Sequence, residues 1–110
     1  MALTSSALTT GQTTVYTSSG NNAITSMIIC NIIAYNPATP SANTANFTLY
    51  AVASGQSAGN TNMIVNAIPI TAGETLSLDQ EKLVLANGDS LVAVSSVGTT
   101  LVMTLSTLAV

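Results

Sequence analysis

This chain of 110 residues has no histidine and no tryptophan, and Lys82 is its only basic residue. Charged residues make up 5% of the chain, against about 25% in an ordinary soluble domain. Binding to nucleic acid or to anionic lipid requires clustered lysine and arginine, so we expect no nucleic acid and no membrane as a partner. Histidine is the commonest general acid or base in catalysis, and its absence leads us to expect that the protein is not an enzyme.

Cysteine is nearly absent as well. Cys30 stands alone and cannot form an internal disulfide, so folding does not depend on an oxidising compartment. Zinc sites need several Cys and His ligands and are excluded. Cys30 lies in an apolar run and is interpreted as a small buried residue. Because Asp79, Glu81 and Asp89 lack EF-hand spacing, a solvated charged loop is favoured over a calcium site, and no metal or cofactor is expected.

Long hydrophobic runs are also missing. No run reaches the ~20 apolar residues that span a bilayer. Residues 1–6 have neither the basic start nor the apolar centre of a secretion signal. The sequence therefore predicts a protein that is made and assembled in a cytoplasm.

The sequence does contain short apolar segments rich in β-branched residues, of which residues 24–35 are the longest. Alternate residues of a strand point to opposite faces, and neither face of this segment is polar. It is predicted to be a central strand, with one face on a second sheet of the same domain and the other available to a partner molecule. Pro37 and Pro40 follow in a loop, where their missing N–H groups do no harm.

Seven or eight such segments are separated by turn residues, and none of useful length shows helical spacing. The pattern predicts an all-β fold, an antiparallel β-sandwich or a closely related barrel, formed by residues 13–110 as a single domain. We expect residues 13–17 to form a hairpin with the central strand, and Asn87-Gly88 to form a tight turn. The remaining expected strands are residues 46–53, 62–70, 75–78, 83–85, 90–96 and 100–110.

Residues 1–12 are rich in threonine and serine, with Leu3 and Leu8 as apolar anchors. This composition cannot bury enough surface to fold alone. The segment is predicted to be a flexible N-terminal arm that becomes ordered on contact with a partner.

The large apolar members of the strands are predicted to form one core, made of Phe47, Leu49, Leu91, Leu105, Ile28 and Ile32. The opposite face of the central strand and the anchors of the arm form the candidate assembly surface, namely Leu3, Leu8, Met27, Ile29, Ile33 and Tyr35. Sugar binding in a groove lined by tyrosines is a second interpretation, although tyrosines on strands are more often half-buried packing residues. The three tyrosines are Tyr16, Tyr35 and Tyr50.

Three features follow one another along the chain. They are an opening strand that ends in Tyr16-Thr17, a long strand that reads Ile24-Thr25-Ser26 followed by apolar residues and Asn31, and a closing segment Leu83-Val84-Leu85-x-x-Gly88-Asp89-Ser90-Leu91. With residues 48–52 and 70–78 they cover most of positions 15–96. In these features the chain resembles small β-sandwich virion structural proteins of tailed bacteriophages, of the capsid decoration or tail-associated type.

The resemblance implies a non-enzymatic virion protein, assembled in the host bacterial cytoplasm, that acts as a capsid decoration (cement) subunit through apolar and uncharged polar surfaces. Its implied partners are further copies of itself, as a homotrimer, and other virion proteins such as the major capsid protein. A tail, fibre or neck-associated subunit and a carbohydrate-binding β-sandwich module are the alternatives. The resemblance supplies no catalytic residue, and the near absence of charge departs from the family pattern.

Overall fold

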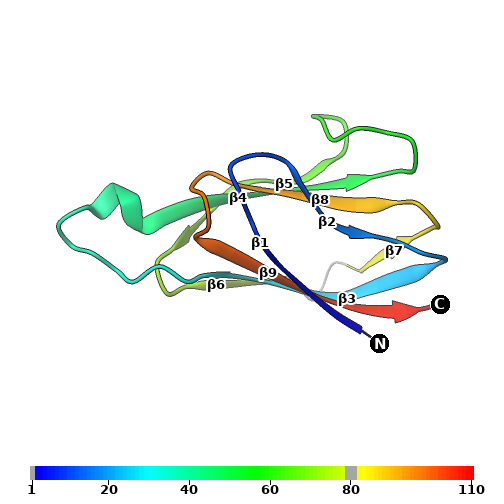
Figure 1. Cartoon of the computed structure of the whole chain (residues 1–110), viewed down its shortest axis with the longest axis horizontal. Coiled ribbons are helices and arrows are strands. Elements are labelled where there is room, and N and C mark those ends of the chain that lie inside the picture. The colour runs from blue at the N-terminus through cyan, green and yellow to red at the C-terminus, as the bar shows by residue number, and fades with distance from the viewer. Residues whose placement is uncertain (1, 79–81) are drawn as a thin grey trace.

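The computed structural model describes residues 2–78 and 82–110, and these residues form nine strands and one short 3-10 helix (Figure 1). The elements are β1 Ala2–Ala7, β2 Thr13–Thr17, β3 Asn22–Asn31, η1 Pro40–Asn43, β4 Thr44–Val52, β5 Met63–Thr71, β6 Thr75–Leu78, β7 Leu83–Leu85, β8 Ser90–Ser95 and β9 Leu101–Ala109.

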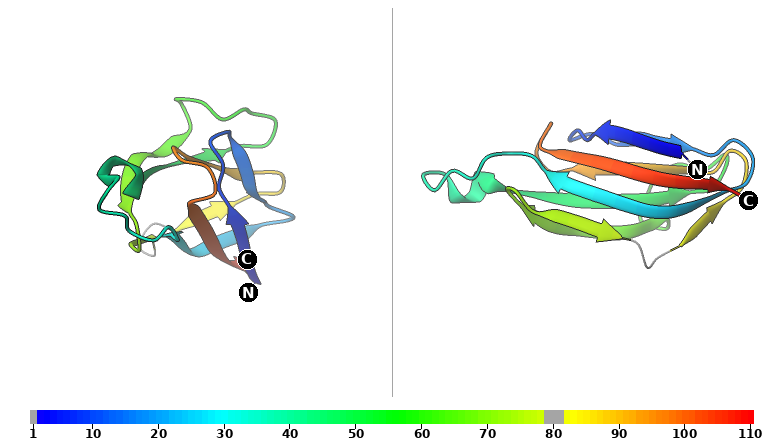
Figure 2. Two further views of the ribbon diagram at one scale, coloured as in Figure 1. Left: turned by 60° about the vertical axis from the view of Figure 1, so that its left-hand side comes forward. Right: turned by 90° about the horizontal axis from the view of Figure 1, so that it is seen from below.

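Two antiparallel sheets pack face to face, which confirms the predicted all-β sandwich. The β3 sheet has the order β1-β9-β3-β6, and β7 also pairs with β3; the β4 sheet has the order β2-β8-β4-β5. Figure 2 shows the β3 sheet from β1 across β9 and β3 to β6 in its right panel. Over the described residues the two sheets stay separate and do not close into a barrel.

β3 is the central strand that its apolar run predicts, because it pairs with β9 along one side and with β6 and β7 along the other. A register shift between Ile24 and Ser26 marks a bulge. A bulge adds one residue to a strand and so changes which residues share a face. Ile24 therefore points inward together with Met27 and Ile29, and all three are buried.

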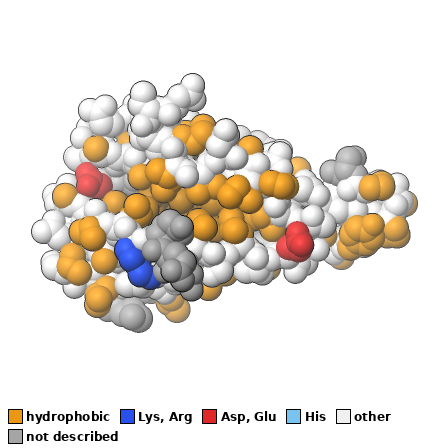
Figure 3. Space-filling view, turned by 180° about the vertical axis from the view of Figure 1, so that it is seen from behind, with side chains coloured by type: hydrophobic (Ala, Val, Ile, Leu, Met, Phe, Trp, Pro, Cys, Tyr) orange, Lys and Arg blue, Asp and Glu red, His pale blue; other side chains and the backbone are white. Residues whose placement is uncertain are grey.

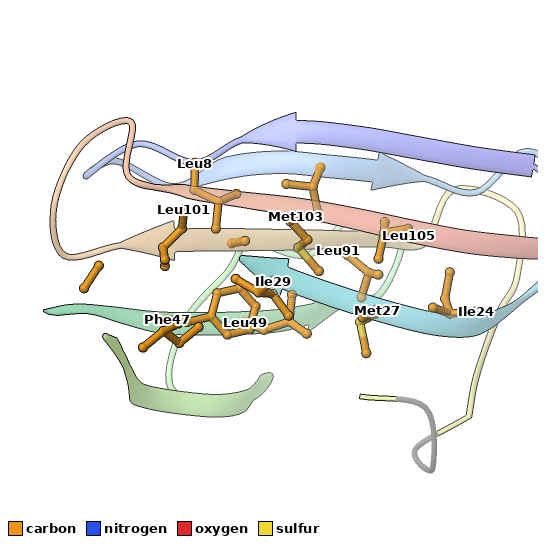
Figure 4. Close-up of a cluster of buried hydrophobic side chains, with 14 of the residues drawn as sticks. Leu8, Ile24, Met27, Ile29, Phe47, Leu49, Leu91, Leu101, Met103 and Leu105 are labelled. Atoms are coloured by element: carbon orange, nitrogen blue, oxygen red, sulfur yellow. The ribbon is translucent and has the colours of Figure 1, made fainter. Parts of the chain in front are cut away.

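The core lies between the sheets, where Phe47, Leu49, Leu91 and Leu105 are fully buried as predicted (Figure 4). The prediction for Ile28 and Ile32 is wrong, because these side chains are 41% and 61% exposed. Ile28 lies on the outer side of β3, opposite to Met27 and Ile29, and Ile32 follows the end of the strand at Asn31. The sequence-based assignment of the two faces of this strand is thus reversed, and the buried positions are completed by Leu8, Leu101 and Met103.

β3 ends at Asn31, four residues before the end of the apolar run. The N–H of Ile33 donates to Asn31 Oδ1 over 3.1 Å. This short-range bond between a side chain and the backbone two residues later turns the chain out of the sheet. The strand therefore ends at the hydrogen bond to the Asn31 side chain, although the following residues Ile32 and Ile33 are apolar.

Residues 2–12 do not form a separate arm, which corrects the prediction made for residues 1–12, of which residue 1 lies outside the described residues. β1 pairs with β9 from Ala2 opposite Thr107 to Ala7 opposite Val102, and the side chain of Leu8 is fully buried in the core. Serine and threonine are compatible with a strand whose backbone is paired with an apolar neighbour. Segment composition predicted disorder, but the edge of β9 supplies the missing hydrogen-bond partners.

The expected hairpin between β2 and β3 does not form, because β2 pairs with β8 in the opposite sheet. The turn at Asn87-Gly88 is present, and Gly88 has a φ of 89°. It joins β7 in one sheet to β8 in the other. It is therefore a connection between the two sheets, whereas the turn of a hairpin joins two neighbouring strands of one sheet. Asp89 Oδ1 and Oδ2 accept the N–H groups of Ser54 and Ala86 at 2.9 Å each, which fixes this corner.

Candidate interaction surfaces

The described charged side chains bond to backbone groups of the fold. Glu74 Oε1 accepts the N–H of Thr71 over 3.0 Å in the turn between β5 and β6. Lys82 Nζ donates to the carbonyl oxygen of Thr25 over 3.0 Å. Together with Asp89 in the turn that joins the two sheets, these groups stabilise connections between strands.

In the part of the chain that the structure describes, no three Cys, Asp or Glu side chains gather as metal ligands. Asp79 and Glu81 lie outside the described residues, so the interpretation of their segment as a solvated charged loop stays a prediction. Cys30 is half-buried, which corrects its assignment to the core. It shares the outer face of β3 with Ile28, two residues earlier.

The open side of the sandwich between β5 and the pair β6 and β7 carries an apolar groove of about 420 Å³. These strands are edges of opposite sheets, so among residues 2–78 and 82–110 no further strand covers the space between them. Figure 3 shows apolar side chains in a band across this face of the molecule. The groove is lined by Met27, Ile64, Val65, Ile68, Leu78 and Leu83.

The groove reaches down to the hydrophobic core. Met27 is 1% exposed and belongs to the core, whereas Ile64 is 47% exposed on the rim. Past Ile68 the groove continues into a hollow of about 260 Å³ that also includes Glu74 and Thr75. An apolar side chain placed in the first part would contact core residues directly, and the second part offers polar groups.

The outer face of the β3 sheet is apolar only at scattered positions. One row across the strands reads Ser5, Thr104, Ile28 and Ser77, and the hydroxyl oxygens of Ser5 and Thr104 are 3.3 Å apart. Hydroxyl side chains therefore separate the exposed apolar ones. Exposed apolar residues of this face include Leu3, Ile28, Val84 and Leu108.

The candidate assembly surface predicted from sequence is only partly a surface. Leu8, Met27 and Ile29 are buried within the chain, at 1% exposure or less, so their assignment to an assembly surface is wrong. The reason is the same reversal of the faces of β3, together with the burial of the residue that follows β1.

The other three predicted residues remain accessible but do not form one patch. Leu3 and Tyr35 are 73% and 62% exposed, and Ile33 is half-buried. Leu3 lies opposite Ser106 in the register of β1 with β9, and Ser106 in turn lies opposite Ser26 near the start of β3. Tyr35 follows the far end of β3, so the structure does not bring Leu3 and Tyr35 together.

The three tyrosines do not form a shared aromatic platform. Tyr16 on β2 is half-buried and packs against the core. Tyr50 on β4 is also half-buried, and Tyr35 lies in the loop after β3. A sugar-binding groove lined by the three rings is therefore not formed by this fold.

The groove residues Ile64 and Ile68 were missed by reasoning from sequence, although a signal for them exists. β5 reads Met-Ile-Val-Asn-Ala-Ile-Pro-Ile-Thr and lacks a consistently polar face. The same pattern in residues 24–35 indicates a strand covered on both sides. In β5, an edge strand, it marks apolar surface that the described strands leave open.

The chain matches no protein-family model, no curated protein and no solved structure. The only helix among the described residues is the four-residue η1, and it is too short to cross a membrane.

Proposed function

We propose that this protein is a non-enzymatic structural subunit of a virus particle, and that it decorates the capsid of a tailed bacteriophage. The resemblance of positions 15–96 to small virion proteins supports the phage assignment. The character of the surface supports an assembly role. In this proposal the capsid lattice is the partner, and the apolar groove between β5 and β6 is the contact.

The observation that carries the proposal is an apolar groove on a molecule with almost no charge. All charged residues lie between positions 74 and 89, so most of the surface exerts little long-range repulsion on neighbouring copies or on a shell. Exposed apolar surface that is continuous with a core is typical of protein contacts. A decoration subunit needs both properties, because many copies must pack closely on a repeating lattice.

Ile68 is the position in the groove best suited to a test, because it is 36% exposed and lines both parts of the hollow. Ile68→Lys places a charge where an apolar side chain of the capsid protein would be buried, and burying an unpaired charge is costly. Val84→Lys is the matched control, since Val84 is 68% exposed on the outer face of the β3 sheet.

The experiment mixes the full chain with undecorated capsids of the phage that encodes it and measures co-sedimentation. We expect the parent and Val84→Lys to bind alike and Ile68→Lys to bind about tenfold or more weakly. Thermal unfolding of each variant checks that the fold is intact. Equal binding of the two variants would remove the groove from the contact, and failure of the parent chain to bind would refute capsid decoration.

The number of copies in intact particles separates decoration from the tail or fibre alternative. Quantitative mass spectrometry of purified particles should find hundreds of copies if the protein decorates the capsid. About a dozen or fewer would favour a tail, fibre or neck position.

A further inference from the structure

The edges of the two sheets differ in how well they are protected against pairing with another strand. Exposed edges are normally interrupted by bulges, prolines, charges or short strands. β2 has a register shift between Thr14 and Tyr16. β5 contains Pro69, register shifts opposite β4, and Ala67 at a φ of 51°. β6 and β7 have only 4 and 3 residues.

β1 is an edge strand without any such interruption. It pairs with β9 over six consecutive residues in unbroken register. Its sequence Ala-Leu-Thr-Ser-Ser-Ala contains no proline, glycine or charged residue. Figure 2 shows β1 at the margin of the β3 sheet, beyond β9. Its outer backbone groups are thus available to a further strand.

The residues that present these groups follow from the alternation of the strand. Leu8 donates its N–H to the carbonyl oxygen of Leu101 over 2.9 Å, and its own carbonyl accepts from Thr99 over 3.1 Å. The backbone of Leu8 therefore faces β9, and so does that of every second residue before it. The N–H and C=O groups of Leu3, Ser5 and Ala7 face the open edge.

We infer that two copies of this chain associate by antiparallel pairing of β1 with β1, centred on Ser5. In this register Ser5 lies opposite Ser5 of the second copy, and Leu3 lies opposite the second copy's Ala7. In each of these facing pairs, the outward N–H and C=O groups of one copy form hydrogen bonds with those of the other. The β3 sheets of the two molecules then form one continuous sheet.

A second copy is the favoured occupant because the pairing is complementary to itself. β1 carries no charged side chain, so the pairing places no two like charges opposite each other. The large exposed side chain of Leu3 lies opposite the small side chain of Ala7 in the second copy. Pairing with a different edge of another copy would use an interrupted strand. Because the contact is twofold it closes at two molecules, which departs from the homotrimer implied by the resemblance. The inference does not depend on the proposed virion role.

The test uses Ser5→Pro in the full chain, with Ser77→Pro as the matched control. Proline lacks an N–H, and at an edge position whose N–H faces solvent it is tolerated. Ser77 is on β6, at the opposite margin of the β3 sheet, and lies opposite Ile28. Along this pair of strands, residue pairs that exchange backbone hydrogen bonds alternate with pairs that do not. The Asn31 N–H donates to the carbonyl of Glu74 over 3.0 Å, so the same alternation directs the Ser77 N–H away from β3.

Sedimentation equilibrium should give twice the 11.1 kDa chain mass for the parent and for Ser77→Pro. Ser5→Pro should raise the dissociation constant about tenfold or more, because it removes the donor at the centre of the interface from both copies. A monomeric or trimeric parent would overturn the inference, and so would a Ser5→Pro variant that dimerises as tightly as the parent.

Amide hydrogen exchange of the unmodified chain gives a second measurement that does not rely on a variant folding. The N–H groups of Leu3, Ser5 and Ala7 should be protected at high protein concentration and lose protection on dilution, whereas that of Ser77 should exchange quickly throughout. Fast exchange of Leu3, Ser5 and Ala7 at all concentrations would contradict the pairing even if the chain forms dimers.

Discussion

Asn31 Nδ2 donates a 2.8 Å hydrogen bond to the backbone carbonyl oxygen of Ile70. Asn31 is on β3 and Ile70 is on β5, so this bond links the two sheets at one end of the sandwich. Asn31 also donates to the carbonyl of Asn43 over 3.4 Å and is 2% exposed. A buried polar side chain is stable in such a place only when its donors and acceptors are paired.

Asn31→Ala should lower the free energy of unfolding by about 1–3 kcal/mol, because it removes the side-chain hydrogen bonds to the Ile33 N–H and to the Ile70 carbonyl oxygen, each worth about 0.5–1.5 kcal/mol. Urea denaturation monitored by circular dichroism measures this change. Asn46→Ala is the control: Asn46 is exposed on β4, so its loss should change stability by about 0.5 kcal/mol or less. Equal effects of the two variants would mean that the link between the sheets contributes little.

Asn31→Asp keeps the shape of the side chain and removes its donor. Near neutral pH a carboxylate oxygen would face the carbonyl oxygen of Ile70, so this variant should be destabilised as well. The protonated carboxyl group has an O–H to donate. Because the protonated form favours the folded state, the stability of this variant relative to the parent should rise as the pH is lowered and fall as it is raised. A difference that is independent of pH would argue against a donor role for Asn31.

The strands could largely be predicted from the sequence because their signals are local. Alternation and flanking turn residues located 13–17, 75–78 and 83–85 at the bounds the structure has. What failed depends on distant residues. The bulge between Ile24 and Ser26 arises in the pairing of β3 with β9, and it decides the face of Ile24. The partner of β2 and the ordering of β1 are likewise set by strands about 70 or more residues away in the chain.

The sequence predicted that the protein has an apolar, weakly charged interaction surface, but it did not predict where on the fold this surface lies. Low charge and an excess of apolar residues are properties of composition and indicated an assembling module. The position of the groove depends on which strands become edges, and this is settled by sheet order. Met27 and Ile64 are far apart in the sequence and lie in one groove because β6, β7 and β5 end their sheets on the same side.

Phe47→Ala should be strongly destabilising, because Phe47 is fully buried between the sheets. Large-to-small changes of this kind cost about 3–5 kcal/mol, which is a large part of the about 5–15 kcal/mol that stabilises a typical domain. Thermal and urea unfolding measure the loss. Leu108→Ala is a control with an exposed side chain, 42% accessible, and should stay close to the parent. A Phe47→Ala variant that melts within a degree or two of the parent would remove Phe47 from the core.

Gly88→Ala should lower stability by about 1–3 kcal/mol, because Gly88 has a φ of 89° and L-residues with a Cβ are strained there. An added Cβ would also lie 2.6 Å from Ser54 Oγ. Gly59→Ala is the matched control, since a Cβ at Gly59 meets no atom within 4 Å, and its stability should change by less than about 1 kcal/mol. Urea denaturation compares the two variants, and a Gly88→Ala effect no larger than that of Gly59→Ala would show that the corner between the sheets adapts freely.

Leu8→Ala tests whether the N-terminal segment belongs to the folded domain. Leu8 is fully buried among core residues, whereas Leu3, five positions earlier, is 73% exposed. Leu8→Ala should therefore cost about 2–5 kcal/mol, and Leu3→Ala should change stability by about 0.5 kcal/mol or less. Both are measured by urea denaturation at a dilution where the chain is monomeric, because association adds apparent stability by mass action. Deletion of residues 2–12 should destabilise at least as much as Leu8→Ala, since it removes β1 from the edge of β9 as well. A deletion variant with the stability of the parent would restore the interpretation of this segment as an independent arm.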